Sequence, residues 1–192
     1  NGVKTVKKIV EKSIKLRIPI ITFYVFSTEN WKRPKSEISF LFKLIINYFK
    51  EELGRVIANG IKVNILGKAS RLPSKINLAL KDVVKKTKKN KKIIVNLAIN
   101  YGSRDEIVEA CKKTSNTINI QSLSKNLYTK NLPNPDILIR TGGHKRLSNF
   151  MLWQLAYTEI YFIDKLWPDF NGGDFERIIN NFKKVKRNFG SI

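Results

Sequence analysis

An uncharged run of eight residues, Pro19 to Phe26, is the strongest structural signal in this sequence. Near-continuous apolar stretches of this length are typical of strands buried on both faces of a parallel sheet, because a strand with one wet face would alternate apolar and polar residues. Parallel strands are joined by long crossovers that are usually helices. The run therefore predicts an α/β fold.

Hydrophobic periodicity predicts the other elements, and a chain of 192 residues is about the length of one large domain. A serine and a glutamate three residues apart, Ser103 and Glu106, predict a capping box at the start of one helix. We expect a single α/β domain over residues 1–192, with a largely parallel central sheet flanked by helices. The predicted strands are 61–67, 92–100, 136–140 and 159–163 besides the first, and the predicted helical segments are 3–16, 36–57, 74–86, 103–113, 122–128, 149–155 and 174–187.

Charge and cysteine content narrow the function classes. The formal net charge of +22 favours an anionic partner such as a phosphate ester, a membrane surface or nucleic acid. One cysteine, Cys111, and one histidine, His144, cannot form a disulfide or a Cys/His zinc site, which favours a reducing, intracellular compartment. The apolar runs are too short to span a membrane.

Two loops that follow predicted strands contain candidate binding and catalytic residues. The segment from Ile139 to Ser148 combines three cations, two hydroxyls and two glycines, which are the groups that bind phosphate oxygens. The segment from Phe26 to Pro34 offers Ser27 and Asn30 as hydrogen-bonding groups, Arg33 as a cation and Trp31 as a flat apolar surface. Parallel sheets bind ligands at the carboxyl ends of their strands, so we look for a site after Phe26, Asn100, Arg140 and Ile163.

Four blocks of the sequence resemble the conserved motifs of the cis-prenyltransferases, the undecaprenyl and dehydrodolichyl diphosphate synthases. They occur in the family's order over nearly the whole chain. The blocks are Phe26-Ser-Thr-Glu-Asn-Trp-Lys-Arg-Pro34, Asn96 to Arg104, Asp136 to Phe150, and Leu152 to Phe170 with its Glu-Ile-Tyr-Phe and Leu-Trp-Pro-Asp-Phe segments.

The resemblance implies a Mg2+-dependent homodimer that adds isopentenyl diphosphate repeatedly to an allylic diphosphate such as farnesyl diphosphate, at a membrane surface. By motif position, Arg140, Arg146 and Ser148 would bind the diphosphate of isopentenyl diphosphate. Glu159 would help bind Mg2+, either in its own site or in the site of the partner subunit. The residues that would form the condensation site are Phe26, Ser27, Asn30, Trp31 and Arg33, with Asn30 near the departing proton.

The long helix predicted from Ser36 has more large apolar residues than one packed face requires. In the family a hydrophobic tunnel between this helix and the sheet holds the product. Ordinary core packing is the alternative for each of these residues. Those that would line the tunnel are Phe42, Ile45, Ile46 and Phe49.

Other residues within the motif blocks have plainer interpretations. Trp153 and Trp167 are predicted to be packing residues, and Glu29 a loop carboxylate. Arg104 is a weak site candidate, because it lies at a helix start where a structural role is expected.

Two departures from the family pattern bear on activity. The family begins with a strand that ends in an Asp-Gly-Asn-Gly-Arg-Trp motif, which this sequence does not contain, so we expect an N-terminal strand to be missing from it. In addition, His144 stands where the family commonly has an acid. A neutral imidazole still binds a metal or an ordered water, so His144 is a candidate metal-side residue, with an ordinary surface loop as the alternative.

Two other functions compete with catalysis. A non-catalytic subunit that stabilises an active partner would have the same fold, and His144 favours it weakly. A nucleic-acid-binding module ranks third, because only nine of the 37 cations are arginine and no recognised nucleic-acid-binding motif occurs. The lysine-rich run 85–92 is interpreted as a solvated loop, and no nucleic-acid partner is expected.

Overall fold

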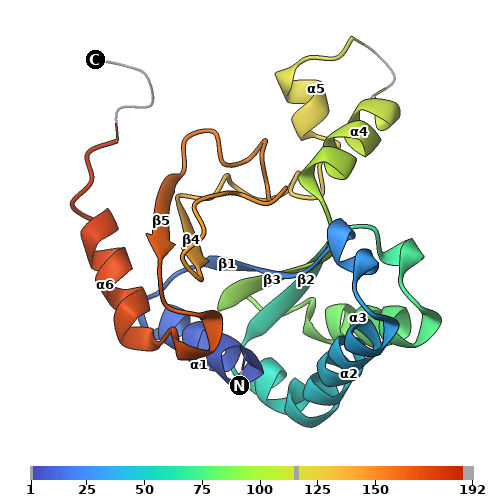
Figure 1. The fold of residues 1–192 in the computed structure, drawn as a ribbon, viewed down its shortest axis with the longest axis horizontal. Helices are drawn as coiled ribbons and strands as arrows, with labels where there is room; N and C mark the ends of the chain where they lie inside the picture. The colour runs from blue at the N-terminus through green and yellow to red at the C-terminus, as the bar shows by residue number, and fades with distance from the viewer. Residues whose placement is uncertain (1, 115–116, 188–192) are drawn as a thin grey trace. The chain divides into compact units, whose positions relative to one another are not determined.

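The computed structural model describes residues 2–114 and 117–187. The chain divides into two compact units (Figure 1). One unit comprises Ile18–Asn131, and the other comprises Asn1–Arg17 with Leu132–Ile192. Both are α/β units with parallel strands, so the predicted α/β class is confirmed, with its strands in two sheets rather than one. Ser115 and Asn116 lie outside the described residues.

The Ile18–Asn131 unit contains a three-stranded parallel sheet in the order β1-β3-β2. Its strands are β1 (Ile20–Ser27), β2 (Ile61–Leu66) and β3 (Ile93–Tyr101). The central strand β3 is buried along almost its whole length, as its apolar sequence predicts. The helices of this unit are α2 (Lys35–Ala58), α3 (Ser74–Thr87), α4 (Ser103–Lys113) and α5 (Ile120–Ser124), with 3-10 turns η1 (Thr28–Lys32) and η2 (Ala69–Arg71).

A ladder of polar side chains crosses this sheet. Asn96 on β3 donates from its amide to Thr22 Oγ1 on β1 at 3.1 Å, and accepts from Asn64 Nδ2 on β2 at 3.2 Å. The three residues are direct register partners. A one-residue slip of either outer strand would leave the fully buried Asn96 without these partners, so the ladder helps to fix the register.

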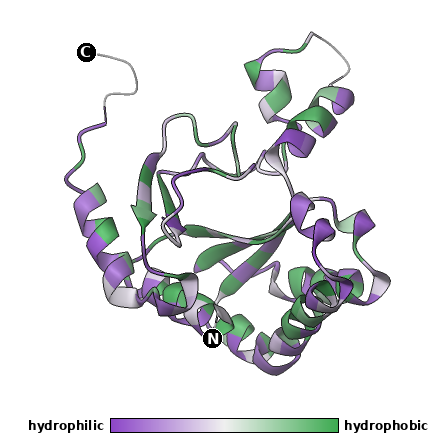
Figure 2. Ribbon diagram, viewed as in Figure 1, coloured by the Kyte–Doolittle hydropathy of each residue, from purple (hydrophilic) through white to green (hydrophobic). Residues whose placement is uncertain are grey.

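Helix α2 buries the apolar face predicted from its sequence. Helices α2 and α3 contact each other, and hydrophobic and hydrophilic residues alternate along both (Figure 2). The buried residues of α2 include all four tunnel candidates, Phe42, Ile45, Ile46 and Phe49.

The second unit contains a two-stranded parallel sheet. Its strands are β4 (Ile137–Thr141) and β5 (Glu159–Ile163). Helix α1 (Gly2–Lys15) contacts α6 (Gly172–Phe182) and the 3-10 turn η3 (Trp167–Asp169).

Trp167 joins α1 to η3. Its indole donates to the Gly2 carbonyl at 3.1 Å, and its ring stacks on Phe170 with centroids 6.1 Å apart. The predicted packing role of Trp167 is therefore confirmed.

Three local predictions are wrong. The Ser103–Glu106 capping box does not form: Gly102 precedes the helix, and the Glu106 carboxylate instead accepts from Tyr101 Oη at 2.6 Å and Tyr128 N at 2.8 Å. These donors lie in the interior, where leaving them unpaired would be costly.

The other two errors concern helix extent. Residues 149–155 form turns rather than a helix, because Asn149 and Met151 adopt left-handed φ values of 64° and 47°. Helix α6 ends at Phe182 instead of Arg187. Within the described residues, no helix is both long and apolar enough to cross a membrane.

Candidate functional site

The loop after β1 holds the predicted condensation residues. Ser27 ends the strand, and its backbone N–H donates to Asn30 Oδ1 at 2.9 Å, which closes the following 3-10 turn. Arg33 forms an exposed ion pair with Glu37 at 2.7 Å, one helical turn further on. The loop after β1 is therefore an ordered turn with Ser27 and Asn30 in contact.

The aromatic residues of this loop pack as a cluster. The ring of Phe26, 1% exposed, lies 5.0 Å from that of Trp31 and 5.2 Å from that of Phe42 on α2, centroid to centroid. The rings of Trp31 and Phe42 are 5.8 Å apart. Trp31 still exposes 38% of its surface, so it packs against these rings while part of it remains open to solvent.

Asn100, at the end of β3, holds the indole of Trp31. Trp31 Nε1 donates to Asn100 Oδ1 at 2.7 Å, and Asn100 Nδ2 donates to the Lys68 carbonyl at 2.9 Å. Asn100 adopts a left-handed φ of 50°, which asparagine tolerates better than most residues. The side chain thus links three strand ends: the β1 loop, the β2 loop and β3 itself.

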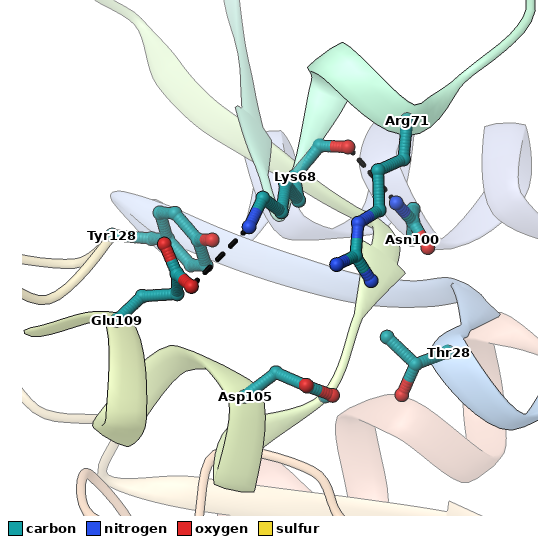
Figure 3. Close-up of a pocket in the computed structure, with 8 residues that line it drawn as sticks. Thr28, Lys68, Arg71, Asn100, Asp105, Glu109 and Tyr128 are labelled. Atoms are coloured by element: carbon teal, nitrogen blue, oxygen red, sulfur yellow. Dashed lines mark hydrogen bonds and ion pairs between the residues drawn. The ribbon is translucent and has the colours of Figure 1, made fainter.

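A cleft lies at the carboxyl ends of these three strands. It encloses about 350 Å³ of empty space, part of it open to solvent. Figure 3 shows the Arg71 guanidinium reaching into this space, with Thr28 and Asp105 across from it. On the far side Lys68 pairs with Glu109 at 3.3 Å, which lowers the pKa of Glu109. Burial, together with the negative charge of Glu106, raises the pKa of Tyr128.

Sequence reasoning missed most of the residues that line this cleft. It searched the ends of four strands but omitted the end of β2, which supplies Lys68 and Arg71. The same rule of strand ends, applied to Gly67, would have found both. Arg104, the weak site candidate, does not line the cleft, whereas its neighbour Asp105 does.

The predicted phosphate-binding residues lie in the other unit, after β4. Arg140 Nη1 donates to Ser148 Oγ at 2.8 Å and also to the Arg146 carbonyl. The structure therefore brings Arg140, Arg146 and Ser148 together across eight residues of sequence. Ser148 and the following Asn149 have left-handed φ values of 50° and 64°. The backbone therefore turns sharply at this point, and this turn positions the Ser148 hydroxyl.

The two glycines of this loop have a different role from the one expected. Their N–H groups do not face a ligand: Gly142 N donates to the Lys165 carbonyl at 2.8 Å, and Gly143 N donates to the Ile163 carbonyl at 3.1 Å. Both have positive φ, 88° and 72°, which glycine adopts without strain. They turn the chain back over the end of β5, and their N–H groups are engaged in these backbone hydrogen bonds.

Arg140 has unused capacity to bind an anion. Within the described residues, its buried Nε–H has no hydrogen-bond partner. Burial and the positive charge of Arg146 lower the pKa of Arg140. Two neighbouring cations with an unsatisfied donor are stabilised when an anion binds between them.

The two candidate metal residues do not converge. Glu159 begins β5 opposite Ile137, whereas Arg140 lies opposite Phe162, three positions or roughly 10 Å along the strands. His144 follows Gly143, which is bonded to the far end of β5, and it is exposed. Among the described residues, no three His, Cys, Asp or Glu side chains form a metal-binding group.

Parallel strands with a cleft at their carboxyl ends, together with an arginine–serine cluster suited to an anion, are features of α/β proteins that bind ligands at strand ends. A family model whose description names undecaprenyl diphosphate synthase matches residues 1–190. The chain belongs to this family, the cis-prenyltransferases, and it is a prenyltransferase enzyme.

Named relatives and solved structures agree with this assignment. The chain is 41% identical to an isoprenyl transferase of Clostridium perfringens, over 100% of this chain and 79% of that protein. It is 42% identical to an isoprenyl transferase of Rickettsia typhi, over 98% and 85%.

Two crystal structures are similar over 99% of this chain. One is a probable undecaprenyl diphosphate synthase from Campylobacter jejuni, with a TM-score of 0.90, 41% identity and 92% of that chain covered. The other is lavandulyl diphosphate synthase from Lavandula x intermedia in complex with dimethylallyl diphosphate, with a TM-score of 0.93, 31% identity and 86% covered.

Proposed function

We propose that this enzyme condenses isopentenyl diphosphate repeatedly onto an allylic primer such as farnesyl diphosphate and so makes a long-chain polyprenyl diphosphate. The observation that carries the proposal is the unpaired, buried Nε–H of Arg140 beside Arg146 and Ser148, within the described residues. A similar structure is a complex with dimethylallyl diphosphate, an allylic diphosphate of this substrate class.

Each residue of the anion site has a distinct task in this proposal. Arg140 donates from its guanidinium to the diphosphate of isopentenyl diphosphate, and Arg146 adds a second positive charge. Ser148 accepts from Arg140 Nη1, which holds its hydroxyl oxygen beside the guanidinium. These contacts orient the isopentenyl group for attack.

The β1 loop forms the condensation site. Phe26 and Trp31 supply an apolar wall that excludes water from the carbocation-like allylic carbon, and Arg33 is a second cation for diphosphate. Ser27 and Asn30 form the polar pair beside the carbon that loses its proton, with Asn30 oriented by the Ser27 N–H.

We propose Mg2+ as the cofactor. Magnesium usually binds through one or two carboxylates together with substrate phosphates, and it draws charge from the leaving diphosphate. In this proposal Glu159 supplies the carboxylate, and the His144 imidazole binds a metal-bound water. Because Glu159 lies away from Arg140 along the same strands, we assign it to the site of a second copy in a homodimer.

The growing product needs an apolar environment. We assign the α2 residues Phe42, Ile45, Ile46 and Phe49 to a tunnel that the chain enters during elongation. The whole of residues 1–192 then acts as one catalytic domain. A water-insoluble polyprenyl product also places the enzyme at a membrane surface, facing the cytoplasm.

Incorporation of labelled isopentenyl diphosphate onto farnesyl diphosphate tests this function, with protein expressed from its complete reading frame. We expect butanol-extractable polyprenyl product that requires Mg2+. Arg140→Ala should lower kcat/KM for isopentenyl diphosphate roughly ten- to hundredfold, because it removes charge-assisted hydrogen bonds.

Arg55→Ala is the matched control, since Arg55 is an exposed arginine of α2 paired with Glu52 at 3.1 Å. It should leave kcat/KM unchanged. A folded protein that makes no product alone, but becomes active with a homologous partner, would contradict the proposal and identify an accessory subunit.

A further inference from the structure

The most concentrated charge in the molecule lies on α3 and the loop after it. Residues 75–92 contain eight lysines and one acid, Asp82, so this tenth of the chain carries +7 of the net charge of +22. All eight lysines are exposed. We call this surface the α3 basic face; its residues are Lys75, Leu78, Lys81, Lys85, Lys86, Lys88, Lys89, Lys91 and Lys92.

Helical geometry places the basic face opposite the core. Helix α3 buries Ile76, Leu80, Val83 and Thr87, which lie on one side at about 100° per residue. By the same rotation the lysines of the helix lie on the other side, with Leu78 among them. Leu78 is 67% exposed, which makes it an apolar side chain at the centre of a field of lysines.

Few of these charges are neutralised by the protein. Lys86 pairs with Asp82 at 2.8 Å. For the other seven lysines, the described part of the chain offers no acidic group within ion-pair distance. Their mutual repulsion is relieved when an anionic partner binds.

The composition of the face selects the partner. It contains no arginine, whose planar fork recognises individual phosphates, and residues 74–92 contain no aromatic side chain on which a base could stack. Lysines on flexible stems around an exposed leucine suit a bilayer instead, where the ammonium groups meet headgroups and the leucine enters the interface. We propose that the α3 basic face docks the enzyme onto an anionic phospholipid membrane.

This inference rests on the proposed function only for the reason that docking is useful: a polyprenyl product passes from the enzyme into the lipid bilayer. Docking itself is an equilibrium that needs no substrate. It is therefore measured without catalysis, and its failure is distinguishable from failure of the proposed activity.

Co-sedimentation with sucrose-loaded vesicles tests the proposal. The vesicles are phosphatidylcholine alone, or phosphatidylcholine with about one third phosphatidylglycerol. We expect binding to the anionic vesicles that weakens with salt and falls about fivefold for each lysine removed, so that replacing Lys75, Lys81, Lys85 and Lys89 by Gln lowers the affinity roughly a hundredfold or more. Leu78→Ser should weaken binding several-fold without changing the charge.

The matched control replaces four exposed lysines of the other unit, Lys4, Lys8, Lys15 and Lys184, by Gln, with the same change in net charge. It should retain most of the binding. Equal loss in both quadruple variants would overturn the proposal, since net charge and not this face would be responsible. Equal binding to neutral vesicles, or tighter binding of the face to duplex DNA than to anionic vesicles, would also overturn it.

Discussion

Asn100 shows how one side chain can position the loop after β1. Its carboxamide accepts from Trp31 Nε1 at 2.7 Å and donates to the Lys68 carbonyl at 2.9 Å, and it is 2% exposed. Both atoms of the amide are used, so the side chain fixes the indole relative to the end of β2. Removing one partner of such a hydrogen bond leaves the other polar group unpaired, which lowers the free energy of unfolding by about 1–3 kcal/mol.

We predict that Asn100→Gly releases Trp31. Glycine keeps the left-handed φ of 50° and removes only the side chain, so the backbone should persist. In a 15N spectrum, the Trp31 indole N–H should shift and exchange faster with solvent, and kcat/KM should fall several-fold. Trp31→Phe assigns the resonance and gives the second edge of a double-mutant cycle, with an expected coupling of about 1 kcal/mol.

The control is Asn96→Ala, which removes a buried asparagine of the same strand that does not contact the loop. It should lower stability but leave the Trp31 signal in place. A Trp31 signal that survives Asn100→Gly unchanged would show that the aromatic cluster alone orients the indole.

At the scale of an element, the start of α6 is held by reciprocal hydrogen bonds and ion pairs. Asn171 Oδ1 accepts from Asp174 N at 3.1 Å, and Asp174 Oδ2 accepts from Asn171 N at 3.3 Å. The Asp174 carboxylate also binds Lys165 at 2.8 Å and Arg177 at 2.5 Å. The hydrogen bond from Lys165 is the main reason that the pKa of Asp174 lies below its ordinary value of 3.8.

We predict that Asp174→Asn lowers the free energy of unfolding at pH 7 by about 1 kcal/mol. A carboxylate with a depressed pKa stabilises the fold above its unfolded value of 3.8, and this stabilisation is lost as pH falls through the lower folded value. The difference between the two proteins in urea unfolding should therefore be constant from pH 7 to pH 5 and shrink below pH 4. Asp169→Asn, which removes one carboxylate at an exposed position, is the control for the change in net charge. A difference between Asp174→Asn and the wild type that persists at low pH would assign the loss to packing.

For the whole molecule, the separation of Arg140 and Glu159 predicts a shared active site. Two impaired variants, Arg140→Ala and Glu159→Gln, should regain activity when they are mixed and allowed to exchange subunits. In a mixed dimer one site would carry both defects and the other neither, so equal mixing should restore about one quarter of the wild-type rate. Analytical ultracentrifugation confirms the dimer, and a mixture that remains inactive while dimeric would place both residues in one site of one chain.

The sequence alone determined the α/β class, the order of the strands along the chain and the residues of the two loops. These features depend on local periodicity and on motifs within a few residues: an uncharged run for β1, and the sequence Arg-Thr-Gly-Gly-His-Lys-Arg-Leu-Ser for the anion site. Arg140 and Ser148 meet because a tight turn joins them. Contacts between residues this close in sequence can be predicted from local geometry alone.

Only the tertiary structure decided which distant residues meet. Trp31 and Asn100 are 69 residues apart, and their contact depends on β1 and β3 being paired in one register. Ser103 and Glu106 have the spacing of a capping box, but the Glu106 carboxylate accepts hydrogen bonds from Tyr101 Oη and Tyr128 N instead. Residues 149–155 have helical spacing, yet adopt left-handed turns. In each case long-range pairing and burial outweigh a local preference of about 1 kcal/mol or less, which is why the sequence pattern could not reveal it.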